Sequence, residues 1–174
     1  MKPNLALLLL LATASYGQNK LDSLWRPFQP FIGNWTGSGD GIDGIGTYER
    51  SYQFVLNKNY IEVKNKTVYA ATKEKPKGYV HEDVGYISYD KMRKKFVFRQ
   101  FHGEGFVNQY VLESLSSDSK TLAFVSEAIE NIPAGWRARE TYTIDNNSFT
   151  EVFNLAEPGK EFEPYTKAVL TRKK

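Results

Sequence analysis

Downstream of Pro30, apolar and polar residues alternate in short segments, which turn-forming residues separate roughly every 8–14 positions. Such alternation is typical of a strand with one face toward a core. We predict strands at 31–39, 47–55, 60–70, 78–89, 95–102, 105–115, 121–129, 135–144, 148–155 and 165–172. No convincing helical period follows Pro30, so the strands are expected to pair antiparallel. The predicted fold is all-β, a closed up-and-down barrel of about ten strands.

The segment Phe31–Gly39 is the predicted opening strand, and a glycine-rich turn follows its Trp35. In a closed barrel the first and last strands are neighbours, so residues 166–172 are expected beside it. Arg172 would then stack on the Trp35 ring, a contact worth about 0.5–1 kcal/mol at an exposed site. The alternative is that Trp35 is one core aromatic among many.

Three parts are predicted along the chain. Residues 1–17 combine a basic start, an unbroken apolar run at 5–12 and small residues before Gln18, as in a secretory signal peptide. The run is shorter than the roughly 20 apolar residues that span a bilayer. Residues 18–30 have apolar side chains at helical spacing and are predicted as a short helix and lead-in, and 31–174 as the barrel domain. We therefore expect export to the periplasm or the exterior, with no integral membrane segment in the mature form.

Composition and charge exclude several classes of protein. The 23 basic and 20 acidic residues give a net charge of +3 and form no basic stripe, so nucleic-acid binding is not predicted. Because the chain has no cysteine, disulfides and thiolate metal sites are excluded. Its two histidines, His81 and His102, are fewer than the three or four nitrogen or sulfur ligands of a usual zinc site. No zinc site is predicted, and the sequence assigns no other metal.

Alternation places polar groups on three faces that are otherwise largely apolar. His102 shares a face with Phe96 and Phe98, Glu140 with Trp136 and Tyr142, and Glu151 with Phe149 and Phe153. A carboxylate on an apolar face is costly unless it is paired or neutralised, so these groups are candidates for a pocket. The alternatives are that the faces are reversed, or that the two glutamates pair across strands with arginines at positions 99, 137 or 139.

Three short motifs resemble those of a known family. They are the run Gly33-Asn-Trp-Thr-Gly-Ser-Gly39, the strand His81-Glu-Asp-Val-Gly85-Tyr86 and the closing Leu170-Thr-Arg172. Here the chain resembles the calycin-like barrels, most closely the nitrobindin family of haem-binding ten-stranded barrels. The segments at 85–90 and 94–97 also resemble uncharacterised exported bacterial barrels.

The resemblance implies a hydrophobic pocket that holds haem b and meets small diatomic or peroxide-type oxidants. In the family the iron ligand is a histidine on the last strand, whereas this chain has no histidine after His102. Tyr165 and Lys167 fall near that position, and a tyrosinate can hold haem iron. His81 matches the histidine of the middle motif. The cofactor is left open, with haem b as a candidate.

The predicted function is an exported barrel that binds a small hydrophobic ligand, as a monomer or homodimer, rather than an enzyme. Two alternatives stay open: a lyase- or isomerase-type barrel enzyme with glutamate and arginine in the pocket, and a filled barrel acting as an interaction module. The predicted ligand-binding residues are Trp35, His81, His102, Glu140, Tyr142, Glu151, Phe153 and Tyr165.

Overall fold

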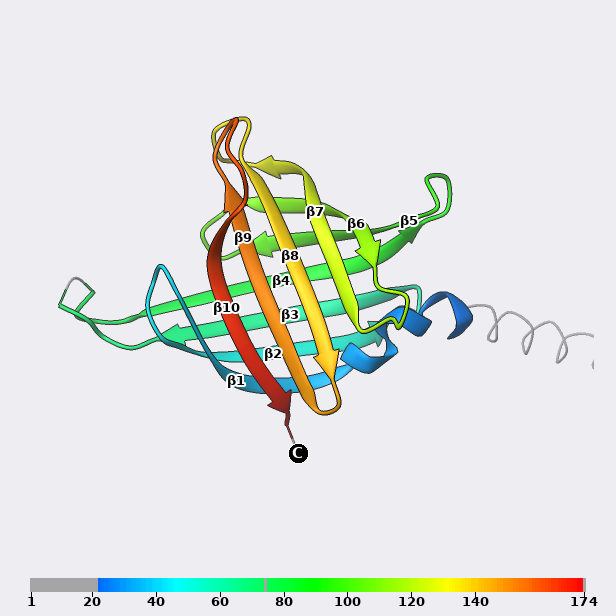
Figure 1. The fold of residues 1–174 in the computed structure, drawn as a ribbon, viewed down its shortest axis with the longest axis horizontal. Coiled ribbons are helices and arrows are strands. Elements are labelled where there is room, and N and C mark those ends of the chain that lie inside the picture. The colour runs from blue at the N-terminus through cyan, green and yellow to red at the C-terminus, as the bar shows by residue number, and fades with distance from the viewer. Residues whose placement is uncertain (1–21, 74, 174) are drawn as a thin grey trace, which may run out of the picture. The chain divides into compact units, whose positions relative to one another are not determined.

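Ten antiparallel strands follow one another around a closed barrel in the computed structural model, which describes residues 22–73 and 75–173 (Figure 1). Each strand pairs with its neighbours in sequence, and the last pairs with the first. The predicted fold class is thereby confirmed. The strands are β1 (Gly33–Gly41), β2 (Gly46–Val55), β3 (Tyr60–Tyr69), β4 (Tyr79–Asp90), β5 (Lys95–His102), β6 (Val107–Leu115), β7 (Thr121–Glu130), β8 (Arg137–Asp145), β9 (Ser148–Ala156) and β10 (Glu163–Arg172).

The barrel closes between β1 and β10, as the sequence predicts. Trp35 lies opposite Arg172 in the register, and the guanidinium carbon of Arg172 is 4.3 Å from the centroid of the Trp35 ring. Arg172 also donates a hydrogen bond of 2.6 Å to the carbonyl of Ile32. The indole of Trp35 donates to the carbonyl of Phe31 at 2.8 Å. These contacts fix the opening strand against the end of the chain.

The segment before the barrel forms a separate compact unit that ends at Pro30. Its described part contains a helical turn at 22–24 and the start of a 3₁₀ helix, η1 (Arg26–Phe31). The rings of Trp25 and Phe28 meet edge to face within it. The predicted signal peptide lies outside the described residues, and no described helix has the length and apolarity needed to cross a membrane.

Aromatic side chains fill one half of the barrel, toward the turns that join β2 to β3 and β8 to β9. Their ring centroids lie between 5.3 and 6.4 Å apart, mostly in edge-to-face pairs. Such pairs add about 0.5–1.5 kcal/mol each to their burial. Alternation brings these rings inward, so this half is a solid core. The cluster consists of Phe31, Trp35, Tyr52, Phe98, Tyr110, Phe124, Tyr142 and Phe149.

We expect the substitution Gly37→Ala to destabilise the protein by about 2 kcal/mol or more, because strand β10 leaves no room for a side chain there. A Cβ atom at Gly37 would lie 2.1 Å from the carbonyl oxygen of Val169 and 2.7 Å from Cα of Leu170. Both are backbone atoms, so the β1–β10 pairing itself would have to move. Urea unfolding followed by tryptophan fluorescence measures the loss.

Ser38→Ala is the matched control, because Ser38 is exposed on the same strand. This substitution should change the free energy of unfolding by no more than about 0.5 kcal/mol. Equal stabilities for the Gly37→Ala and Ser38→Ala variants would contradict the tight closure described above.

Candidate ligand-binding site

The other half of the barrel holds an internal cavity of about 480 Å³. It lies toward the turns that join β1 to β2, β5 to β6 and β7 to β8, which contribute Asp43, Phe106 and Ile132 to its wall. The inward positions of β7 to β9 continue this wall with apolar groups. Cavities of roughly 300–1,000 Å³ with mostly apolar walls are typical of small-molecule sites. Apolar lining residues include Ile129, Pro133, Trp136, Phe153 and Leu155.

A buried ion pair forms the floor of this cavity and separates it from the aromatic half. Arg50 on β2 contacts Glu151 on β9 through two hydrogen bonds, Nη2 to Oε1 at 2.6 Å and Nε to Oε2 at 2.9 Å. Both side chains are less than one-tenth exposed. The parallel geometry of the two bonds is the strongest form of an arginine–carboxylate contact.

The remaining guanidinium nitrogen of Arg50, Nη1, is also hydrogen-bonded. Its Nη1 reaches the carbonyls of Glu49 and Lys66 at 3.0 and 3.2 Å, and the hydroxyl of Thr67 at 3.3 Å. Burial alone would lower the pKa of Arg50, but the Glu151 carboxylate outweighs burial and raises it. Arg50 is therefore a fixed positive charge that is committed to Glu151.

Arg50 is a site residue that sequence reasoning missed. On β2 it occupies the inward position between Tyr48 and Tyr52, both buried. An arginine between two aromatic residues on an inward face is the signal that would have revealed it. The alternative pairing of the glutamates with residues 99, 137 or 139 is not observed for Glu151, whose partner is 101 residues away in sequence.

Glu140 is the second buried carboxyl group at this level. It lies on β8 beside Glu151 and Asp83, and its Oε2 has no hydrogen-bond partner within the described chain. Burial raises the pKa of Glu140 well above the ordinary range, and the charges of Glu151 and Asp83 raise it further, against the opposing effect of Arg50. Burial therefore favours the neutral, protonated form of Glu140, which adds no charge to the ion pair.

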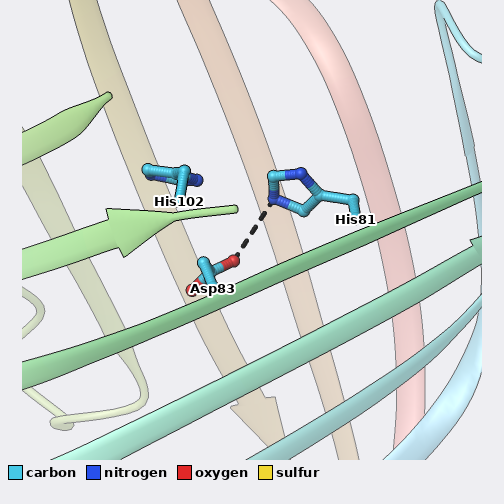
Figure 2. A group of neighbouring side chains, drawn as sticks. All are labelled: His81, Asp83 and His102. Atoms are coloured by element: carbon cyan, nitrogen blue, oxygen red, sulfur yellow. Dashed lines mark ion pairs between the residues drawn. The ribbon is translucent and has the colours of Figure 1, made fainter. Parts of the chain in front are cut away.

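His81 and Asp83 project from alternate positions of β4 toward the same interior (Figure 2). Nε2 of His81 is 3.3 Å from Oδ2 of Asp83, and Nδ1 of His81 is 2.8 Å from Oε1 of Glu104. Tyr79 also donates a hydrogen bond to Glu104. The other carboxylate oxygen of Asp83 accepts hydrogen bonds from two side-chain amides, those of Asn65 and Gln100, each at 2.8 Å.

His102 lies opposite Asp83 in the β4–β5 register, and its ring centroid is 5.4 Å from that of His81. Its Nε2 is 3.1 Å from the amide nitrogen of Asn108, and its ring stacks on Phe106 at 4.0 Å. Burial lowers the pKa of His102 to about 4, so the imidazole is neutral at pH 7. Figure 2 shows Asp83 close to both imidazole rings.

Six of the eight predicted ligand-binding residues border the cavity: His81, His102, Glu140, Glu151, Phe153 and Tyr165. The inward faces predicted for β5, β8 and β9 agree with the observed burial. Trp35 and Tyr142 instead lie in the aromatic half, where they pack on Phe149. Sequence reasoning missed Arg50 and Asp83, together with the amides of Asn65, Gln100 and Asn108.

A closed ten-stranded barrel with an apolar-walled cavity and a polar floor belongs to the class of small-ligand-binding barrels. The family described as "THAP4-like, heme-binding beta-barrel domain" matches residues 25–172. The chain therefore belongs to this family of haem-binding β-barrel domains, which confirms the resemblance inferred from the sequence motifs.

Comparison with solved structures finds the same fold in the crystal structure of Rv2717c from M. tuberculosis. The TM-score is 0.67 at 18% sequence identity, and the match covers 87% of this chain and 98% of the other. Comparison with curated proteins finds no significant match.

The last strand does not offer the axial ligand that the family resemblance implies for haem. Its inward positions include Ala168 and Leu170, which are buried and bear no donor, and Lys167 is exposed on the outer face. Tyr165 borders the cavity, but burial raises the pKa of its phenol, which disfavours the tyrosinate that binds iron. The residues of β10 thus do not fit axial ligation of haem.

Breaking the Arg50–Glu151 pair should be strongly destabilising. We expect Arg50→Met to lower the free energy of unfolding by about 3–5 kcal/mol at pH 7, because it leaves a buried carboxylate without its partner. In the double variant Arg50→Met/Glu151→Leu no charge remains, so its stability should exceed that of Arg50→Met. Urea unfolding of wild type, of the single variants Arg50→Met and Glu151→Leu and of the double variant measures the coupling energy between the two side chains.

Additive losses, to within about 0.5 kcal/mol, would show that the two side chains do not depend on each other. Such a result would contradict the role of the pair as a charge-balanced floor.

The raised pKa of Glu140 predicts a defined pH dependence. Above the ordinary pKa of glutamate the unfolded chain releases this proton while the folded protein retains it, so wild-type stability falls as pH rises. Glu140→Gln has no proton to release. We expect the stability of this variant relative to wild type to increase by up to about 1.4 kcal/mol per pH unit above about pH 5. Urea midpoints between pH 4.5 and 8 measure the difference.

The control is Glu161→Gln, at an exposed position outside the barrel interior. Its stability relative to wild type should not change with pH. If the stability of Glu140→Gln changed with pH in the same way as that of wild type, Glu140 would be ionised in the folded protein.

Proposed function

We propose that this protein is an exported barrel that binds one small, largely apolar molecule in the cavity above the Arg50–Glu151 floor. The observation that supports this most directly is the cavity of about 480 Å³ with Trp136, Phe153 and Leu155 on its wall. Membership of a haem-binding domain family supports the same general role. Export rests on the signal-peptide pattern of residues 1–17.

The charges of the floor restrict the kind of ligand. Arg50 and Glu151 neutralise each other, burial favours the neutral form of Glu140, and the carboxyl group of Asp83 lies at the same depth. An anionic group pushed against the floor would meet these carboxyl groups, and among the described residues that line the cavity the one arginine, Arg50, is already bound to Glu151. A suitable ligand therefore has an uncharged apolar body, with any acidic groups directed to the mouth of the cavity.

Haem b is the first ligand to test because of the family, although β10 supplies no histidine. A neutral apolar molecule of similar or smaller size fits the same argument. The identity of the ligand thus depends on binding measurements with more than one probe.

The two alternative functions are less well supported by this geometry. An enzyme that holds a substrate carboxylate needs a free arginine in the pocket, but Arg50 is occupied by Glu151, Thr67 and backbone carbonyls. A pure interaction module would have a filled barrel, whereas only the aromatic half is packed solid.

The test is titration of the purified protein with two probes, the neutral dye Nile red followed by fluorescence and haemin followed by its Soret absorption. We expect at least one to bind saturably at one molecule per chain. Leu155→Trp, which places a larger ring in the cavity, should weaken that binding at least tenfold, which corresponds to about 1.4 kcal/mol.

Asn154→Trp is the control, because alternation directs the neighbouring residue to the outer face. It should bind like wild type. Non-saturable titrations with both probes would overturn the proposal, and so would equal binding by Leu155→Trp and wild type. Binding of Nile red without a Soret change would support an apolar ligand and exclude haem.

A further inference from the structure

Three metal-binding side chains meet on the wall formed by β4 and β5. His81, Asp83 and His102 each offer one donor atom, and these atoms all lie within 4.8 Å of one another. His81 and Asp83 are two residues apart and so share the inward face of β4, and the register places His102 directly opposite Asp83. The cluster is therefore a consequence of strand alternation and pairing.

His81 is oriented through one nitrogen so that the other faces the cluster. Its Nδ1 lies 2.8 Å from the carboxylate of Glu104, which also accepts from Tyr79. A proton on Nδ1 leaves the lone pair on Nε2, and this nitrogen is 3.3 Å from Oδ2 of Asp83. A histidine whose second nitrogen donates to a carboxylate is typical of metal ligands.

Asp83 is held in a similar way. Its Oδ1 accepts hydrogen bonds from Asn65 and Gln100 at 2.8 Å each, so Oδ2 is the oxygen left to face His81. The side chain is only 3% exposed, so the carboxylate has few water molecules to compensate its charge. A buried carboxylate of this kind is stabilised by a nearby cation.

His102 completes the set. Its Nε2 contacts the amide of Asn108, which in turn donates to the hydroxyl of Tyr110 at 2.8 Å. Its Nδ1 is buried and has no hydrogen-bond partner among the residues that the structure describes. Each of the three side chains thus has one atom that is held by a hydrogen-bond partner. The second atom, Nε2 of His81, Oδ2 of Asp83 or Nδ1 of His102, makes no protein hydrogen bond of ordinary geometry and can bind a metal ion.

We propose that His81, Asp83 and His102 bind a divalent first-row transition-metal ion, such as Zn²⁺, Fe²⁺ or Mn²⁺, on the wall of the cavity. Two imidazoles and one carboxylate suit these ions, whereas Ca²⁺ and Mg²⁺ take oxygen ligands. Metal–ligand bonds of about 2.1 Å place donor atoms roughly 3–3.5 Å apart. The three donor atoms, which all lie within 4.8 Å of one another, would approach this spacing by side-chain rotation when the ion binds.

The arrangement suits a bare ion better than haem. Haem iron uses four nitrogens of its own ring and takes one axial ligand on each face. Three donors that converge within 4.8 Å on one wall cannot all serve in that way. With three protein ligands, the ion keeps coordination positions open toward the cavity, which His81 and His102 border. Binding of the ion does not depend on the apolar ligand proposed above.

The test uses tag-free protein, stripped with EDTA and titrated with Co²⁺, because bound Co²⁺ has visible absorption bands. We expect saturable binding of one Co²⁺ per chain, displaced by Zn²⁺, and no competition by Ca²⁺. Asp83→Asn and His102→Gln should each weaken Co²⁺ binding at least tenfold. Glu104→Gln removes only the partner of His81, on the partly exposed side, and should weaken it about 10–100-fold.

Glu82→Gln is the matched control, because Glu82 is adjacent on β4 but exposed and paired with Lys66. It should bind Co²⁺ like wild type. Circular dichroism checks that each variant is folded, and Glu104→Gln remains informative if Asp83→Asn is not. Failure of the wild-type protein to bind Co²⁺ and Zn²⁺ at one per chain would overturn the proposal, leaving His81 as a structural contact between Asp83 and Glu104. The proposal would also be overturned if Glu104→Gln and Asp83→Asn both bound Co²⁺ with the affinity of wild type.

A Nile red titration of the same variants separates this proposal from the ligand-binding function. Loss of Co²⁺ binding with unchanged dye binding supports a metal site that is independent of the apolar wall. Dye binding without any Co²⁺ binding overturns the metal site and leaves the proposed function intact.

Discussion

The ion pair between Arg50 and Glu151 determines how the interior of this barrel is divided. It joins β2 to β9 across β1 and β10, where the closing strands have small inward residues such as Gly39 and Ala168. On one side of the pair the aromatic cluster excludes water, and on the other side the cavity begins. A charge pair at this depth is costly unless it is well hydrogen-bonded, and here each of the three guanidinium nitrogens of Arg50 has a hydrogen-bond partner.

The mutual neutralisation of Arg50 and Glu151 affects the electrostatics of the neighbouring carboxyl groups of Glu140 and Asp83. Arg50 donates hydrogen bonds to Glu151 rather than to Glu140, and burial raises the pKa of Glu140. Asp83 accepts amide hydrogen bonds from Asn65 and Gln100 at one carboxylate oxygen, and its other oxygen faces His81. One constraint therefore links the charge-paired floor to both proposals, an uncharged ligand body in the cavity and a positive ion on the β4–β5 wall.

The alternation of apolar and polar residues predicted the fold and many of the interior residues, because each strand has one face toward solvent and one toward the barrel interior. It placed His102, Glu140 and Glu151 inside, and barrel closure predicted the stacking of Arg172 on Trp35. It did not give depth along the barrel axis, so Tyr142 and Trp35 were grouped with residues of the cavity although they pack in the aromatic half. Depth depends on the stagger between strands, which alternation within one strand does not contain.

The sequence also could not predict which side chains pair across the barrel between strands that are far apart in the chain. Nothing local pairs Arg50 with a residue 101 positions away. The His81–Asp83–His102 cluster depends on the β4–β5 register, and a slip of one residue would turn His102 outward. The prediction that no zinc site exists counted nitrogen and sulfur ligands alone, whereas the register also brings a carboxylate oxygen of Asp83 within 4.8 Å of both imidazoles. Strand pairing rather than composition thus decides whether two histidines are enough to bind a metal ion.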